Sequence, residues 1–179
     1  MKLLLVSILI LLGNNGYVQQ KNNYPIPKTK NLLFYIQRNH NENAIVYDAI
    51  YDKDGKLNPD KPVEAYWIRF QEHGQRMELR YYERWMAYGI KAEKSDNPNY
   101  DYRLYLSASD KVVLWLKQIA PFKSIVITEI NGKPVRLDHL FATLDESGWI
   151  PKVLYGEFYA YYLDNNKAAY KKVFPKDIK

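Results

Sequence analysis

Two arginines, each at the end of an alternating apolar stretch, are the side chains whose spacing most clearly suggests chemistry. In Leu32–Arg38 every second residue is apolar up to Arg38, and in Val63–Arg69 the same alternation leads through Trp67 to Arg69. Alternate residues of a strand lie on one face. If both faces line one interior, two guanidinium groups lie at its rim beside an indole, an arrangement suited to an anionic or amphipathic small ligand. The alternative is that each arginine ends its strand and forms a surface salt bridge.

A polar loop follows the first arginine, and it contributes the other candidates. Residues 38–43 read Arg-Asn-His-Asn-Glu-Asn and are rich in hydrogen-bonding groups. Asparagine is also a common turn residue, because it tolerates a positive φ and bonds its own backbone. The predicted ligand site consists of Arg38, Asn39, Asn41, Trp67, Arg69 and Tyr88.

Metal, cofactor and nucleophilic chemistry are not indicated. The sequence has no GxGxxG, GxxxxGK[ST] or GxSxG motif, and no cysteine, which excludes disulfides, thiol nucleophiles and Cys-ligated zinc. The histidines, at positions 40, 73 and 139, are far apart in sequence, so we predict neither a metal nor a cofactor. Asp138 and His139 are neighbours on one predicted strand, and because strand neighbours face opposite sides we expect no direct acid–histidine pair.

Three strand carboxylates leave one enzymatic alternative open. A glycan hydrolase needs two acids facing one cleft, ~5–9 Å apart. Asp48, Glu64 and Glu157 lie on predicted strands, where a solvent-facing position is the ordinary role. We name no catalytic residue, and a noncatalytic protein is the favoured interpretation.

The elements that must position these side chains are mainly β-strands. Tyrosine occurs 17 times, and period-two alternation recurs between Pro, Gly and Asn turn signals, including Asn131-Gly132, which predicts a type I′ hairpin. Short connections favour antiparallel neighbours. We predict an all-β, mainly antiparallel meander of about nine strands, closed as a barrel or barrel-like sandwich, with one short helix near 77–86. The predicted strands are 32–37, 44–51, 63–70, 87–94, 100–107, 111–118, 123–130, 133–143 and 153–163, with 168–174 as a short edge strand or a helical turn.

Length and composition predict one domain with a leader. With 179 residues, 47% of them apolar, the chain is long enough for one hydrophobic core. Lys2 and the ten apolar-rich residues of Leu3–Leu12 are typical of a secretory signal and too short to span a bilayer. We predict a signal peptide at 1–16, a flexible arm at 17–30, a β domain at 31–174 and a basic tail at 175–179. The mature chain is expected to have no transmembrane segment and to be periplasmic or secreted.

Several segments resemble a bacterial family of unknown function, DUF4833. The similar stretches are Leu33–Ala49, the Asp54-Gly55 turn, Lys61–Arg69, Ala87–Ile90, Ile130–Ala142 and Lys152–Tyr159. The resemblance runs from about Asn31 to Val173. It implies a small domain that often follows a signal sequence, and it supplies no catalytic residues.

Charge and architecture together favour a binding protein. The net charge is +6, but basic residues alternate with 20 acids, and the densest basic cluster is the four lysines of Lys167–Lys176, so no nucleic-acid partner is expected. We expect a β-barrel-like domain that binds a small or amphipathic ligand in its interior. The alternatives are an interaction or structural domain with an envelope protein partner and, less favoured, a glycan hydrolase.

Overall fold

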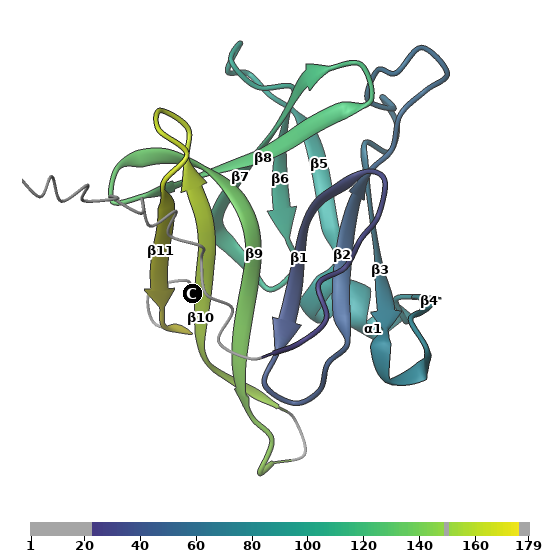
Figure 1. Cartoon of the computed structure of the whole chain (residues 1–179), viewed down its shortest axis with the longest axis vertical. Helices are drawn as coiled ribbons and strands as arrows, with labels where there is room; N and C mark the ends of the chain where they lie inside the picture. The colour runs from purple at the N-terminus through teal and green to yellow at the C-terminus, as the bar shows by residue number, and fades with distance from the viewer. Residues whose placement is uncertain (1–22, 149–150, 176–179) are drawn as a thin grey trace, which may run out of the picture.

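Eleven β-strands form one curled mixed sheet in the computed structural model, which describes residues 23–148 and 151–175 (Figure 1). The strands are β1 (Leu32–Arg38), β2 (Ala44–Ala49), β3 (Val63–Arg69), β4 (Gln75–Glu78), β5 (Ile90–Lys94), β6 (Tyr102–Leu106), β7 (Ser109–Ala120), β8 (Lys123–Ile130), β9 (Lys133–Asp145), β10 (Lys152–Tyr162) and β11 (Ala168–Val173). The helical segments are η1 (Phe70–Glu72), α1 (Tyr81–Glu83) and η2 (Arg84–Tyr88). The predicted β fold with one short helical region is confirmed.

The sheet curls into a half-barrel. Its strand order is β4-β3-β2-β1-β9-β8-β7-β6-β5, and β10 and β11 extend from β9 as a hairpin. The two arms of the curl approach one another where β3 contacts β5. All pairs are antiparallel except β1 with β9, in which Tyr35 lies opposite His139. Most consecutive strands are joined by short connections, which favour antiparallel pairing. Strands β1 and β9 are far apart in the sequence, so no short connection restricts their relative direction.

The inner face of the curl is filled by side chains from nearly all strands. Phe34 stacks on Tyr47 with ring centroids 4.3 Å apart, and both are fully buried. The predicted inward face of the first strand is wrong at Leu32. A β-bulge between Leu32 and Phe34 shifts the register, so Leu33 joins the inner core and Leu32 packs in a second cluster on the outer face.

The outer face of β1 and β2 carries that second cluster and contacts residues 23–31. Gln37, which is fully buried, donates to the carbonyl of Pro25 at 2.9 Å. Thr29 donates to the carboxylate of Asp48, and the backbone N–H of Ala49 donates to the carbonyl of Asn31. This stretch thus runs over the outer face of the sheet.

The helical region begins later than residue 77, where the sequence predicted it. His73 and Gly74 have positive φ values of 58° and 76°, which turn the chain tightly back on β3. Residues 75–78 therefore continue the sheet as β4, with Met77 opposite Trp67, and α1 starts at Tyr81. At the far end a Cβ on Gly89 would lie 1.9 Å from the carbonyl oxygen of Arg84, so the last turn closes over a residue without a side chain.

The Asn131-Gly132 turn is confirmed: φ is 54° and 72°, and the turn joins β8 to β9. Residues 168–174 were predicted as an edge strand or a helical turn, and 168–173 of them form edge strand β11. The predicted signal peptide at 1–16, residues 17–22 of the arm and 176–179 of the tail lie outside the described residues. Within the described residues, no helix has the length and apolar character needed to cross a membrane.

Candidate functional site

Three of the six predicted site residues meet at one end of the inner face. The guanidinium carbon of Arg38 lies 4.9 Å from the ring centroid of Trp67, and Arg38 Nη1 donates to the hydroxyl of Tyr88 at 3.1 Å. The rings of Trp67 and Tyr88 meet edge to face, with centroids 5.5 Å apart. We call Arg38, Trp67 and Tyr88 the arginine–aromatic cluster.

The polar groups of the arginine–aromatic cluster form hydrogen bonds mostly with one another and with adjacent residues. Trp67 is only 4% exposed, and its Nε1 donates to Oε2 of Glu83 at 3.2 Å. The hydroxyl of Tyr47 donates to the carbonyl of Tyr88 at 2.9 Å. Burial raises the pKa of Tyr88, and the positive charge of Arg38 opposes that rise. Arg38 Nε is buried and has no hydrogen-bond partner in the described part of the chain, whereas Arg38 as a whole is half-buried.

The other three predicted residues have separate structural roles. The amide of Asn39 exchanges two hydrogen bonds with the backbone of Leu144, at 3.1 and 2.8 Å, and so fixes the loop after β1 against β9. Asn41 accepts from the backbone N–H of Asn43 within the turn. Arg69 forms an ion pair with Glu72 at 2.9 Å, which is the surface salt bridge considered as the alternative.

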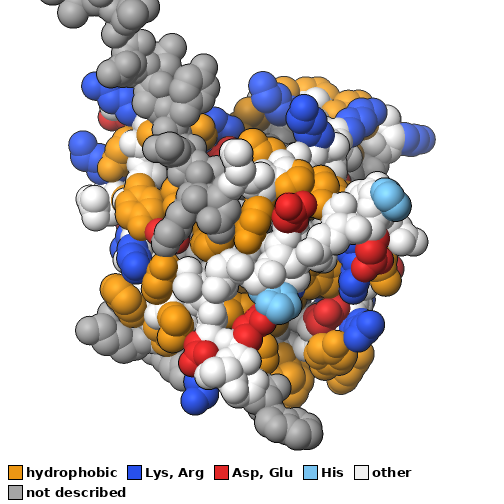
Figure 2. Space-filling model, turned by 60° about the horizontal axis from the view of Figure 1, so that its bottom comes forward, with side chains coloured by type: hydrophobic (Ala, Val, Ile, Leu, Met, Phe, Trp, Pro, Cys, Tyr) orange, Lys and Arg blue, Asp and Glu red, His pale blue; other side chains and the backbone are white. Residues whose placement is uncertain are grey.

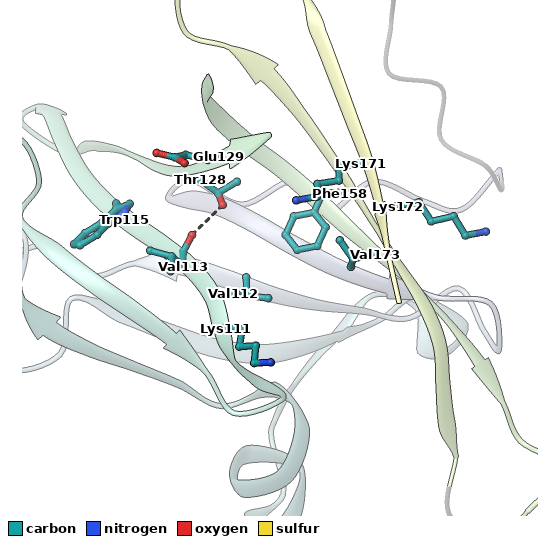
Figure 3. Close-up of a pocket in the computed structure, with 10 residues that line it drawn as sticks. All are labelled: Lys111, Val112, Val113, Trp115, Thr128, Glu129, Phe158, Lys171, Lys172 and Val173. Atoms are coloured by element: carbon teal, nitrogen blue, oxygen red, sulfur yellow. Dashed lines mark hydrogen bonds between the residues drawn. The ribbon is translucent and has the colours of Figure 1, made fainter. Parts of the chain in front are cut away.

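A groove of about 610 Å³ lies elsewhere, between β7 and β8 on one side and β10 and β11 on the other (Figure 3). Its volume falls within the range of small-molecule sites, ~300–1,000 Å³. Phe158 and Val173 form an apolar surface on the hairpin side, and Val112 faces them from β7. We call this space the hairpin groove.

The hairpin groove exists because β7 and β8 separate. Their ladder runs from Ala120 and Lys123 only as far as Trp115 opposite Ile127. Beyond that point β8 pairs with β9, and the hydroxyl of Thr128 donates to the carbonyl of Val113 at 2.9 Å, where a backbone partner is lost (Figure 3). Where β7 and β8 diverge, their side chains form one wall of the groove. The β10–β11 hairpin lies opposite this wall and leaves the space between them open.

Two lysines lie on opposite walls of the hairpin groove. In Figure 3 the side chain of Lys171 extends from β11 toward β8, and Lys111 lies at the other end of the groove on β7, with Val112 and Phe158 between them, whereas Lys172 and Glu129 point away. Lys172 instead places its Nζ 3.2 Å from the ring centroid of Tyr155. Among the side chains that the structure describes, neither Lys111 nor Lys171 has an acidic partner within 4.0 Å. The groove is therefore lined by two lysines and by the apolar side chains of Val112, Phe158 and Val173.

Sequence reasoning missed the hairpin groove. The available signal was the basic cluster at Lys167–Lys176, combined with strand alternation that puts Lys171 and Val173 on one face. That face becomes a wall only because β10 pairs along β9, a partner that alternation does not identify.

The expectation for Asp138 and His139 is wrong. Asp138 Oδ2 lies 2.7 Å from His139 Nδ1. In the ladder with β10, Tyr159 lies opposite His139 and Ala160 opposite Leu137, so Asp138 is the extra residue of a β-bulge, and a bulge breaks the alternation of side chains.

His139 is part of a buried aromatic stack on the outer face. Its ring stacks between Tyr35 and Tyr159, with centroids 4.9 and 4.4 Å away, and the residue is 3% exposed. Such a position, packed on both ring faces, is a structural one.

The three strand carboxylates accept hydrogen bonds from separate partners. Asp48 accepts from the hydroxyl of Tyr66 at 2.7 Å, and Glu157 from the hydroxyl of Tyr170 at 2.7 Å. Glu64 pairs with Arg76 at 3.0 Å, and it lies opposite Asp48 in the β2–β3 ladder. The described residues contain no group of three or more histidine, aspartate or glutamate side chains able to hold a metal ion.

Comparison with known proteins gives one match. No curated protein and no solved structure matches the chain. The family model of DUF4833, a domain of unknown function, matches residues 34–172, which span β1 to β11. The chain therefore belongs to the DUF4833 family.

Proposed function

We propose that this protein is a noncatalytic binding domain for a small amphipathic anion, held in the hairpin groove. The observation that carries the proposal is the position of Lys111 and Lys171 on opposite walls beside Phe158 and Val173. An aliphatic chain would lie along the apolar side chains, and a carboxylate or similar head group would lie beside either ammonium group. Lysine is a flexible point charge, so this site favours charge over one head-group shape.

The groove replaces the barrel interior as the place of the ligand. The inner face is filled by packed side chains, and Trp67, the expected wall of the interior site, is 4% exposed. Val113, which is 36% exposed, and half-buried Val112 leave apolar surface in the groove that an aliphatic chain would cover, whereas Phe158 and Val173 are exposed at only 9% and 6%. The lysines of the groove lie within reach of solvent, so each contributes a modest, salt-dependent share of the binding free energy.

Titration calorimetry with three probes tests the proposal. Decanoate carries both an anion and a chain, acetate only the anion, and decyl maltoside only the chain. We expect decanoate to bind with a Kd on the order of 0.1 mM, because a ligand of this size gains ~0.3–0.5 kcal/mol per heavy atom. Acetate and decyl maltoside should bind at least about tenfold more weakly. Equal binding of decanoate and decyl maltoside would contradict the anionic character of the site.

A pair of charge-matched variants locates the binding. Lys111→Glu combined with Lys171→Glu should weaken decanoate binding about tenfold or more, since two attractions become repulsions. Lys53→Glu combined with Lys61→Glu makes the same charge change in the β2–β3 connection, and it should leave the affinity within about twofold. If both double variants bind as tightly as the parent, the groove is not the site.

We also propose that the mature protein is periplasmic or secreted, after removal of residues 1–16. Support comes from Lys2 followed by the apolar run Leu3–Leu12, the pattern of a secretory signal. Amino-terminal sequencing of the protein from its native cell should find a start near residue 17. An intact Met1 or Lys2 terminus would refute this proposal without affecting the groove.

A further inference from the structure

The helical region leaves four large apolar side chains in solvent. Tyr81 is 85% exposed, Tyr82 52%, Trp85 71% and Met86 57%. They lie within six consecutive residues, whereas the other exposed large apolar residues are scattered over the described surface as single residues or short pairs. Figure 2 shows hydrophobic side chains (orange) at the lower right of the surface, beside both basic (blue) and acidic (red) ones. We call Tyr81, Tyr82, Trp85 and Met86 the aromatic patch.

Hydrogen bonds anchor the helical backbone that carries the aromatic patch to the rest of the fold. Glu83 accepts from the indole of Trp67 at 3.2 Å and from the backbone N–H of Arg80 at 2.8 Å, so the carboxylate in this helix turns inward. On the opposite side the hydroxyl of Ser107 donates to the carbonyl of Arg84 at 2.8 Å. The helical backbone that carries the patch is therefore anchored, and a partner would have to order only the exposed side chains.

Basic residues next to the aromatic patch favour a negatively charged partner. Arg80 and Arg84 flank the patch, and the guanidinium of Arg80 donates to the hydroxyl of Tyr82 at 3.1 Å. Of the nearby acids, Glu83 faces inward, and Glu78 is 3.5 Å from Arg84 and 3.7 Å from Arg76. Arg84 is therefore paired with Glu78, whose side chain is 68% exposed, and Arg80 is the cation left to face a partner. The outward side combines tyrosine, tryptophan and methionine with this arginine, a composition that favours the interface of a negatively charged bilayer.

We propose that the aromatic patch docks the protein on the surface of an anionic phospholipid membrane. Trp85 and Met86 enter the boundary between head groups and acyl chains, while Arg80 lies among the phosphates and Arg84 stays paired with Glu78. The docking is peripheral, since only a short helix takes part. The patch and the hairpin groove share no residue, so this inference stands independently of the proposed ligand.

Vesicle binding by the full chain tests the docking. We expect sedimentation with vesicles of phosphatidylcholine and phosphatidylglycerol at 3:1, and at least about fivefold weaker binding to pure phosphatidylcholine, because arginine near a negative surface adds attraction. Equal binding to both vesicles, or none to either, would overturn the proposal. A dimer in solution that fails to bind vesicles would show that a second copy covers the patch, and would also overturn it.

A local readout separates the patch from the apolar run at Leu3–Leu12. Brominated phosphatidylcholine quenches tryptophan that enters the bilayer, and we expect this quenching to be largely lost in Trp85→Phe. Quenching that persists in Trp85→Phe would place the contact elsewhere and refute the proposal.

Matched variants complete the test. Trp85→Ser with Met86→Ser should reduce binding to the anionic vesicles about tenfold or more, because two apolar groups no longer leave water. Ile119→Ser with Leu163→Ser, exposed at 46% and 45% away from the patch, should change binding less than about twofold. Equal losses from the two double variants would contradict a specific patch.

Discussion

The arginine–aromatic cluster and the hairpin groove both combine cations with aromatic or apolar side chains, yet their environments are opposite. In the cluster, Arg38 stacks on Trp67 and donates to Tyr88, and Trp67 donates to Glu83. In the groove, Lys111 and Lys171 extend from strands that do not pair with each other. The difference teaches that side chains at the end of a complete ladder contact mainly one another, whereas side chains beside a diverging ladder remain open to a ligand.

This comparison predicts a separation of effects. Substitutions in the cluster should change the free energy of unfolding and leave ligand affinity in place. Substitutions in the groove should do the reverse.

The largest effect is expected from Trp67→Ala. The indole is 4% exposed and contacts Arg38, Tyr88 and Glu83, so its removal leaves a cavity and takes one of two hydrogen bonds from the Glu83 carboxylate. We expect a loss of about 3–5 kcal/mol in the free energy of unfolding, measured by urea denaturation. Decanoate affinity of the folded fraction should stay within about twofold. A loss below about 1 kcal/mol would show that the cluster is not part of the stabilising core.

Tyr47→Phe should have an intermediate effect that depends on pH. The variant removes the hydrogen bond to the carbonyl of Tyr88, which is worth about 1 kcal/mol at neutral pH. Burial, and to a lesser degree the nearby Tyr88, raise the pKa of Tyr47 above its ordinary value of 10.0.

The direction of the pH effect follows from that raised pKa. Above about pH 10 the unfolded tyrosine ionises while the buried one stays protonated, so the unfolded state gains stability as the pH rises. Phenylalanine has no such ionisation. The difference in stability between parent and variant should therefore shrink from pH 9 to 11 in denaturation curves, and a difference that grows with pH would contradict the burial of this hydroxyl.

The smallest effect on stability is expected from Lys171→Ala. Its ammonium lies at the groove with no acidic partner among the described side chains, so the free energy of unfolding should change by less than about 0.5 kcal/mol. Decanoate affinity should fall about threefold to fivefold, the share of one exposed charge. A destabilised variant with unchanged affinity would reverse the comparison between the two regions.

Most of the fold follows from local patterns in the sequence, because alternation and turn residues act over a few positions. Asn131-Gly132 predicts its hairpin through a backbone requirement that neighbouring strands do not alter. Bulges are less visible: those at Leu32 and Asp138 each move a side chain to another face, and no composition signal marks either.

The sites were harder to predict because they depend on distant pairing. Strand alternation places Arg38 and Trp67 on inner faces, and the structure brings them together. Strand alternation does not predict that Arg69 forms an ion pair with Glu72 in η1. The hairpin groove depends on two pairings: the end of β8 pairs with β9 but no longer with β7, and β10 pairs along β9. Local strand propensity does not distinguish these partners from the other strands.

The parallel pairing of β1 with β9 has a consequence for synthesis on the ribosome. Asn39 and Leu144, which bond across this junction, are 105 residues apart. Strands β1 to β4 can form their hairpins as soon as they emerge, but the second edge of β1 stays unpaired until β9 has been made. A nascent chain that stalls before residue 133 therefore exposes a sheet edge to neighbouring chains, and assembly of β9 at that edge is the step that ends this vulnerability.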